Sequence, residues 1–148
     1  MKAAQITGYG TPDVSVWGTV QPLKRHSLSA AAECVVVPAD RIAPAPSDIS
    51  PVETASLVVA GTTALLALRD TLHLTKGERL LVRGAAGGVG TAAVQLAHAM
   101  GGHVTALCRD RHAEALRELG ADEVFDYGTT TPDRLGPFDA VLDTVGSD

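Results

Sequence analysis

The sequence predicts an α/β fold with a partial, doubly wound parallel sheet, preceded by a short β-rich segment. From Lys76 onward, short apolar runs alternate with helical patterns, and this order requires crossover connections between parallel strands. Before Ser50, extended segments are instead broken repeatedly by glycine and proline. The chain has 148 residues, enough for one domain and part of another, and its 3% aromatic content indicates a core of Ala, Val and Leu.

The N-terminal segment is expected to contain strands without forming a complete domain. Its candidate strands are Lys2–Thr7, Val14–Val20 and Glu33–Val37. The proline-rich stretch Ala43–Pro46 is typical of a stiff connector. We therefore predict a first unit over residues 1–46, too short for a β core of its own, and a second unit over residues 47–148.

A helix start is marked at Ser50. Ser50 can cap the helix, Pro51 suits the first helical position, and Glu53 can complete a capping box. The helical pattern continues to about Leu72. Because Gly61-Thr62-Thr63 interrupts it, two short helices are expected rather than one long helix, and no apolar run is expected to reach membrane-spanning length.

The second unit is predicted to hold four parallel strands with two connecting helices. The predicted strands are Arg79–Arg83, His103–Cys108, Glu123–Asp126 and Phe138–Asp143. The predicted helices are Gly88–Met100, which ends at Gly101-Gly102, and Arg111–Leu119, with Asp110 as its cap.

The most informative motif lies between the first of these strands and its helix, where the chain reads Gly84-Ala-Ala-Gly-Gly-Val-Gly90. Gly87, Gly88 and Gly90 carry no side chains, so the backbone can approach a diphosphate and the helix can pack close to the strand. The helix N-terminus then offers unpaired N–H groups and the positive end of its dipole. A glycine motif in this strand–turn–helix context predicts a dinucleotide-binding site.

The end of the second strand indicates which dinucleotide is bound. Domains specific for NAD place an acidic residue there, about 20 residues past the glycines, to bind the ribose hydroxyls. Here the strand ends in Ala106-Leu-Cys-Arg109, and a guanidinium can pair with a 2′-phosphate that a carboxylate would repel. NADPH is therefore favoured over NADH. Asp110, interpreted as a helix cap, is the competing ribose ligand, and a solvated Arg109 is the alternative.

Two further residues follow strand ends on the side where a doubly wound sheet binds its ligand. Tyr127 could stack on adenine or bond a phosphate, and an ordinary half-buried tyrosine is equally consistent with the sequence. Asp143 can fix the loop after the fourth strand, and no chemical role is assigned to it.

Composition and spacing argue against several other classes. The formal net charge of −5, with no basic block, argues against a nucleic-acid partner. Cys34 and Cys108 are expected to be buried reduced thiols, and no Cys or His spacing indicates a metal site. Neither tyrosine heads the Tyr-x-x-x-Lys pair that short-chain dehydrogenases require. The N-terminus lacks the apolar stretch of a signal peptide, so a cytoplasmic protein without membrane contact is expected.

The glycine turn and the apolar helix after it resemble the cofactor loop of the medium-chain dehydrogenases/reductases, and most of all their zinc-independent quinone oxidoreductase and enoyl reductase branch. Ala85 stands at the first position of the strict G-x-G-x-x-G pattern, which is usual in that branch. The resemblance runs from about Trp17 to Asp148, with Met1–Ala4 in addition. Other segments similar to the family, in the same order, are Val37–Asp40, Ala60–Ala64, Leu119–Asp122 and Asp143–Gly146.

The resemblance implies a remnant of a GroES-like catalytic domain over residues 1–46, followed by an NADP-binding Rossmann domain over residues 47–148. It implies an NADPH-dependent enzyme that transfers hydride to a quinone or an α,β-unsaturated carbonyl, without metal. No residue of the sequence is an evident proton donor for this reaction, so no catalytic residue is assigned. The residues implied at the cofactor are Ala86, Gly87, Gly88, Val89 and Gly90 at the pyrophosphate, Arg109 and Tyr127 at the 2′-phosphate end, and Thr63 near the nicotinamide.

The sequence also departs from the family pattern. Near Val14-Ser15 it passes from the opening of a GroES-like domain to what resembles the last portion of that domain. It stops at Asp148, after the fourth strand of a fold that usually has six. Both domains are therefore expected to be truncated. The alternative function is a catalytically inactive dinucleotide-binding fragment, and a homodimer is left open.

Overall fold

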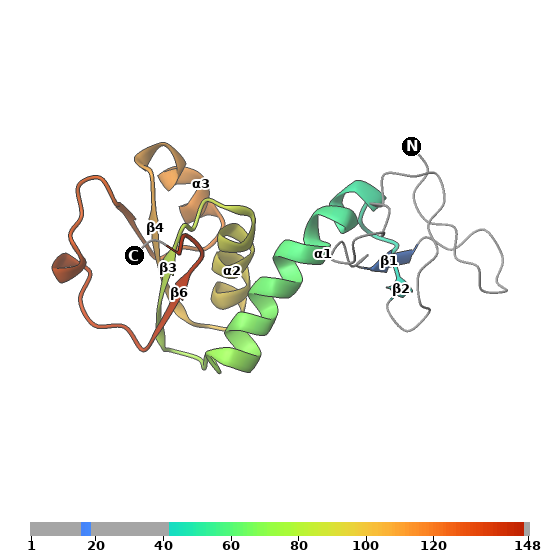
Figure 1. Ribbon diagram of the computed structural model, residues 1–148, viewed down its shortest axis with the longest axis horizontal. Coiled ribbons are helices and arrows are strands. Elements are labelled where there is room, and N and C mark those ends of the chain that lie inside the picture. Colours follow the sequence, from blue (N-terminus) through green and yellow to red (C-terminus); the bar gives the residue numbers. More distant parts are fainter. Residues whose placement is uncertain (1–15, 19–41, 147–148) are drawn as a thin grey trace, which may run out of the picture. The chain divides into compact units, whose positions relative to one another are not determined.

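The computed structural model describes residues 16–18 and 42–146 (Figure 1). The chain divides into two compact units, residues 1–58 and residues 59–148, and each is described by itself. This division falls inside a helix, beyond the predicted boundary at residues 46 and 47.

The described part of the first unit contains a small antiparallel pair of strands. β1 (Val16–Gly18) pairs with β2 (Ile42–Pro44), and Trp17 is in register with Ala43. β2 enters the stretch expected to be only a connector, because a proline at the end of an edge strand removes no ladder hydrogen bond. The predicted strands Lys2–Thr7 and Glu33–Val37 lie outside the described residues.

The helix start at Ser50 forms as predicted. The Ser50 N–H and Oγ–H both donate to Glu53 Oε2, at 2.9 and 2.6 Å, and the Glu53 N–H donates back to Ser50 Oγ at 3.3 Å. These reciprocal bonds make the capping box, and the two that the Glu53 carboxylate accepts from Ser50 lower its pKa because they favour its charged form. α1 then runs over Pro51–Leu66.

The expected break in this helix is wrong. α1 passes through Gly61-Thr62-Thr63 without interruption and continues into a π-helical turn, η2, over Ala67–Thr71. Ala64 and Leu68 are fully buried in the core of the second unit. Burying them stabilises the helical path by more than the weak propensities of one glycine and two threonines oppose it.

The continuity of the helix also corrects the expectation about apolar length. Over Pro51–Thr71 the chain forms 21 helical residues, and an 18-residue window within them has a mean hydropathy of 1.5, long and apolar enough to cross a membrane. Only 22% of that apolar window is buried. Length and composition alone do not establish a membrane span, since a core helix of a globular protein can meet the same test.

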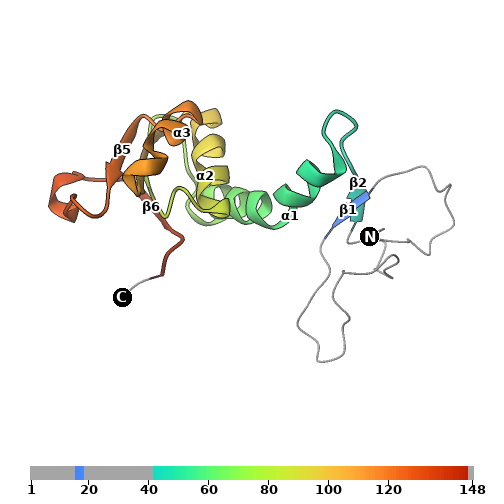
Figure 2. The ribbon, with the colours of Figure 1, turned by 90° about the horizontal axis from the view of Figure 1, so that it is seen from above.

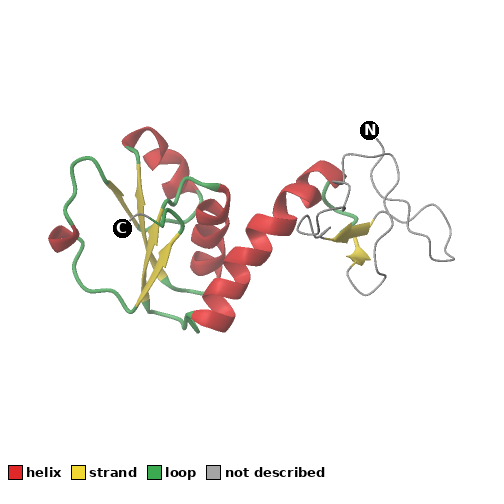
Figure 3. Cartoon of the chain, viewed as in Figure 1, coloured by secondary structure: helices red, strands yellow, loops and turns green. Residues whose placement is uncertain are grey.

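The second unit is built on a four-stranded parallel sheet, as predicted (Figures 1 and 3). The strand order is β5-β4-β3-β6, and every pairing is parallel. The strands are β3 (Arg79–Arg83), β4 (His103–Cys108), β5 (Glu123–Asp126) and β6 (Ala140–Asp143). The fourth strand is two residues shorter at its start than expected.

The helices between the first three strands cover one face of this sheet, and the long connection from β5 to β6 passes over the other (Figure 2). α2 (Gly88–Ala99) follows β3. α3 (Ala113–Glu118) follows β4 and is entered through a 3-10 turn, η3, over Asp110–His112. The opposite placement of the last connection follows from right-handed crossovers, because the chain reverses its direction across the sheet after β5.

The core lies between the sheet and the helical layer. Residues of β3 alternate between buried and half-buried, and Leu80 and Val82 are completely buried. They pack with fully buried small residues of α2 and β4: Ala93, Val94, Ala97, Val104 and Ala106. Such small side chains allow the helix to lie close to the strands, as the low aromatic content indicated.

Candidate dinucleotide-binding site

The strand order reverses between β3 and β6, and the carboxyl ends of these neighbouring strands therefore define a switch point. The predicted glycine turn follows β3 at this point. Gly84 has φ +75°, and its N–H and that of Ala85 donate to the Leu107 carbonyl oxygen at 3.2 and 3.3 Å. The turn is thus anchored to the neighbouring strand β4 before α2 begins.

The glycines of this turn have different structural roles. A Cβ atom on the buried Gly90 would overlap the Gly84 carbonyl oxygen and lie 2.7 Å from Ala85 Cα. Gly87 and Gly88 are exposed, and a Cβ on Gly88 would meet only Ala60 Cβ, at 3.7 Å. Gly90 therefore permits close contact of helix and turn, whereas Gly87 and Gly88 keep the outer surface free of side chains.

The N-terminus of α2 is suited to an anion. Gly87 caps the helix in an extended conformation without a side-chain cap hydrogen bond, and no acidic residue lies in the first turn. The helix begins Gly88-Val89-Gly90, and N–H groups of a first turn have no partner inside a helix. Ala86 lies half-buried just before this turn. The surface combines free donors with the positive end of the helix dipole.

α1 borders the same helix start. Ala60 is the residue whose Cβ lies nearest to the Cβ position of Gly88. Thr63 follows Ala60 by three residues and is therefore its neighbour on the helix surface. Thr63 is exposed.

The loop after β6 closes the other side of the switch point. Thr144 donates through Oγ1 to the Arg83 carbonyl oxygen at 2.9 Å, and a Cβ on Gly84 would overlap this hydroxyl. Asp143 accepts from the Arg83 guanidinium and from the Val145 N–H, both at 2.8 Å. The Val145 N–H, followed by Arg83, lowers the pKa of Asp143. These bonds hold the loop in place, which is the structural role considered for Asp143.

The structure brings together the two side chains predicted at the 2′-phosphate end. Arg109 follows β4 and Tyr127 follows β5, and these strands are paired with Cys108 in register with Asp126. The Arg109 Nε–H donates to the Tyr127 hydroxyl oxygen at 3.3 Å. Both side chains are exposed, and Nη1 and Nη2 of Arg109 are not used in this bond.

The expected capping role of Asp110 is wrong. Asp110 is the first residue of η3, Arg109 stands at the cap position, and the turn has no side-chain cap hydrogen bond. Sequence reasoning missed Asp126 instead. Its Oδ2 accepts from the Asp110 N–H and its Oδ1 from the Gly128 N–H, each at 2.6 Å. The one sequence signal for this role of Asp126 is its position at a predicted strand end, directly before Tyr127.

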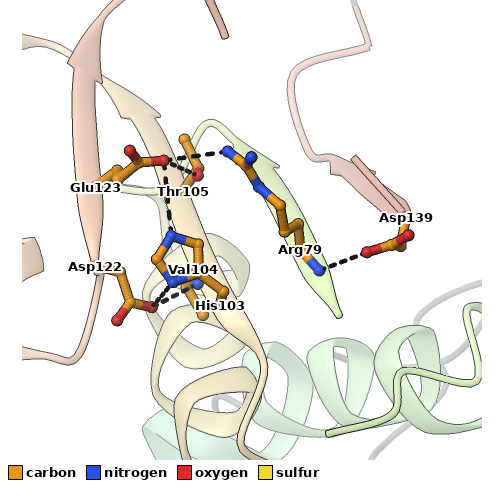
Figure 4. Close-up of polar contacts among 7 residues, drawn as sticks. All are labelled: Arg79, His103, Val104, Thr105, Asp122, Glu123 and Asp139. Carbon is orange, nitrogen blue, oxygen red and sulfur yellow. Dashed lines mark hydrogen bonds and ion pairs between the residues drawn. The ribbon is translucent and has the colours of Figure 1, made fainter. Parts of the chain in front are cut away.

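A second polar cluster lies at the opposite end of the sheet (Figure 4). Glu123 accepts from Thr105 Oγ1 at 3.0 Å, lies 3.5 Å from Arg79 Nη2, and lies 3.7 Å from His103 Nε2. Asp122 accepts from the Val104 N–H at 2.7 Å. These contacts join the amino ends of the strands, away from the glycine turn. Within residues 16–18 and 42–146, no group of three His, Cys, Asp or Glu side chains could hold a metal ion.

A glycine turn at the switch point of a parallel sheet, followed by an uncapped helix N-terminus, is the arrangement of a Rossmann-type dinucleotide-binding fold. Comparison with known proteins agrees. Residues 88–148 match the family model described as zinc-binding dehydrogenase. The chain belongs to the medium-chain dehydrogenase/reductase family, and its relatives include proteins named quinone oxidoreductase and enoyl reductase.

Three similar proteins illustrate this relationship. The mitochondrial NAD(P)H oxidoreductase RTN4IP1 of Mus musculus is 40% identical over 146 residues, which cover 93% of this chain and 36% of that protein. The trans-enoyl reductase pgmF of Aspergillus terreus is 35% identical over 119 residues, which cover 78% of this chain and 33% of that protein. The structure of the quinone oxidoreductase of Thermus thermophilus, solved also with NADPH, has a TM-score of 0.68 at 40% identity. The match covers 75% of this chain and 38% of that one. The chain thus spans little more than a third of the length of these relatives.

The comparisons overturn the expected cytoplasmic location. Five relatives at 36% to 40% identity are named as mitochondrial proteins. The expectation depended on the missing apolar stretch of a secretory signal. Mitochondrial targeting segments are amphipathic and rich in arginine, so the absence of an apolar stretch does not bear on them.

Proposed function

We propose that this chain is the NADPH-binding part of an oxidoreductase that transfers hydride to a quinone or an α,β-unsaturated carbonyl. The observation that carries the proposal is the glycine turn at the α2 N-terminus, with Arg109 and Tyr127 at the ends of the two strands beyond it. Relatives named NAD(P)H oxidoreductase, quinone oxidoreductase and trans-enoyl reductase support the reaction class.

The residues of the turn fit a pyrophosphate. Ala86, Gly87, Gly88, Val89 and Gly90 are proposed to hold it with backbone N–H groups, because the exposed glycines leave the approach open and no carboxylate lies in the first helical turn. Thr63 is proposed to lie near the nicotinamide, since α1 runs beside the same helix start. The nicotinamide would supply the hydride, and the protein would supply orientation and polarity.

NADPH is proposed over NADH on electrostatic grounds. The free Nη groups of Arg109 can form charge-assisted bonds to a 2′-phosphate, and the Tyr127 hydroxyl keeps the guanidinium at the strand ends. The nearby carboxylate of Asp126 already accepts two backbone N–H groups. Asp110 remains the competing ribose ligand, because its side chain caps no helix.

A dinucleotide-binding module without turnover is the second candidate. It rests on the same glycine turn and helix N-terminus, which would bind a dinucleotide with or without hydride transfer. Mixing the protein with NADPH and a simple quinone, and following the loss of NADPH absorbance, separates the two candidates. Binding without turnover supports the module, and turnover supports the enzyme.

The binding site itself is tested by Gly88→Asp, with Gly88→Ala as the matched control. Both variants place a Cβ in the same open position, and only Asp adds a negative charge at the helix N-terminus. Calorimetry should show NADPH binding to Gly88→Ala and not to Gly88→Asp. Equal binding by both variants would refute the proposed pyrophosphate site.

A further inference from the structure

We infer that Asp126 is a positioning residue for 2′-phosphate recognition: its carboxylate joins the turns that carry Arg109 and Tyr127 and holds these side chains at one site. The inference rests on the proposed NADPH function. It extends that function to a residue that does not itself touch the phosphate.

The geometry places Asp126 between the two turns. It ends β5, in register with Cys108 at the end of β4. Its Oδ2 accepts from the Asp110 N–H, 16 residues earlier in the chain, and its Oδ1 accepts from the Gly128 N–H. Both distances are 2.6 Å, short for bonds from backbone N–H groups to a charged acceptor.

Each bond fixes the backbone next to one of the binding side chains. Asp110 directly follows Arg109, and Gly128 directly follows Tyr127. The Tyr127 N–H also donates to the Cys108 carbonyl oxygen at 3.2 Å. The 3.3 Å contact between Arg109 Nε and the Tyr127 hydroxyl therefore forms between two backbone segments that the same carboxylate holds together.

This arrangement lowers the cost of binding a phosphate. Arg109 and Tyr127 are exposed, and long exposed side chains lose conformational entropy when a ligand orders them. Holding both backbones in the bound arrangement beforehand leaves less freedom to lose. Because both Asp126 oxygens accept backbone donors, its negative charge is partly balanced near the place where the phosphate would bind.

The test compares two ligands that differ only in the 2′-phosphate, adenosine 2′,5′-bisphosphate and 5′-AMP, by calorimetry on the full chain. Asp126→Ala is expected to weaken binding of the bisphosphate about tenfold while 5′-AMP affinity changes by less than about twofold. Asp126→Asn keeps the size of the side chain and one acceptor oxygen. Its affinity for the bisphosphate should fall between that of the wild type and that of Asp126→Ala. It provides the same comparison if Asp126→Ala does not fold.

Asp122→Ala is the matched control. Asp122 precedes β5 and also accepts a backbone N–H from β4, that of Val104, but at the opposite end of the strands. Its loss should lower stability without changing the ratio of the two affinities. If Asp122→Ala changes this ratio as much as Asp126→Ala does, the effect is a general loss of structure and the inference is wrong.

Arg109→Ala separates failure of the inference from failure of the proposed function. If Arg109→Ala lowers the ratio and the Asp126 variants do not, the positioning role is refuted while NADPH preference stands. If Arg109→Ala also leaves the ratio unchanged, the 2′-phosphate site itself is refuted. In the double variant, removing Asp126 should cost little more than Arg109→Ala alone, and fully additive losses would contradict action through Arg109.

Discussion

A single methyl group added at Gly90 tests the close packing on which the dinucleotide site depends. In Gly90→Ala, the new Cβ would overlap the Gly84 carbonyl oxygen and lie 2.7 and 2.8 Å from two backbone atoms of Ala85. These are backbone atoms within one tight turn, so no flexible side chain can move aside. Overpacking of this kind costs about 1–3 kcal/mol. The gain in helix propensity from Gly to Ala, at most about 1 kcal/mol, offsets only part of a cost in the middle or upper part of this range.

Gly88→Ala is the comparison, because it adds the same methyl group where the nearest atom is Ala60 Cβ at 3.7 Å. That contact is ordinary, and the propensity gain makes the change neutral or stabilising by up to about 1 kcal/mol. Because the propensity gain is common to both variants, they should differ by about 1–3 kcal/mol. For a unit of this size, this difference corresponds to roughly 4–24 °C in Tm.

Urea unfolding and thermal melting followed by circular dichroism measure this difference directly. Gly90→Ala should also weaken NADPH binding, because relieving the overlap moves the start of α2 away from the turn. A Gly90→Ala protein that melts at or above the temperature of Gly88→Ala would refute the packing role of Gly90, and with it the division of roles among the three glycines.

Three further predictions follow from the same structure. Arg109→Ala should reduce the preference for NADPH over NADH about 10- to 100-fold, the value of a charge-assisted bond, and an unchanged ratio of the two Kd values would contradict this. Leu80→Ala, which removes a fully buried side chain from the centre of the sheet, should lower the free energy of unfolding by about 2–5 kcal/mol in urea titrations. Asp143→Asn should lower stability at neutral pH. Because the folded state lowers the pKa of Asp143, its contribution is complete above its unfolded pKa of about 3.9 and is lost as the pH falls further. The stability gap between wild type and variant, measured across pH, should thus narrow below about pH 4, and a gap that widens there would contradict the assignment.

Local signals predicted much of the second unit and the start of α1. The parallel strands β3, β4 and β5 have the bounds expected from their apolar runs, and the Ser50–Glu53 capping box forms as predicted. The glycine turn joins β3 to α2, as its strand–turn–helix pattern predicted. Each of these features depends on residues close together in the chain, so the pattern of residue types was sufficient to indicate it.

Other features depended on contacts between distant residues. The helix α1 continues through Gly61-Thr62-Thr63 because Ala64 and Leu68 are buried against the sheet, and no local pattern contains that information. The same continuity produces one long apolar helix where two short helices were expected. Asp110 was expected to cap a helix, yet its N–H bonds to Asp126, 16 residues away.

The order of residue types was sufficient to predict a strand, a glycine-rich turn and a helix suited to a diphosphate, because hydrophobic periodicity and glycine act over a few residues. Tertiary structure alone brought Arg109 beside Tyr127 and placed Asp126 between their turns. The parallel pairing of β4 with β5 sets this register. Hydrogen bonds between strands join residues that are far apart in the chain, so a pattern of neighbouring residues does not predict which residues meet.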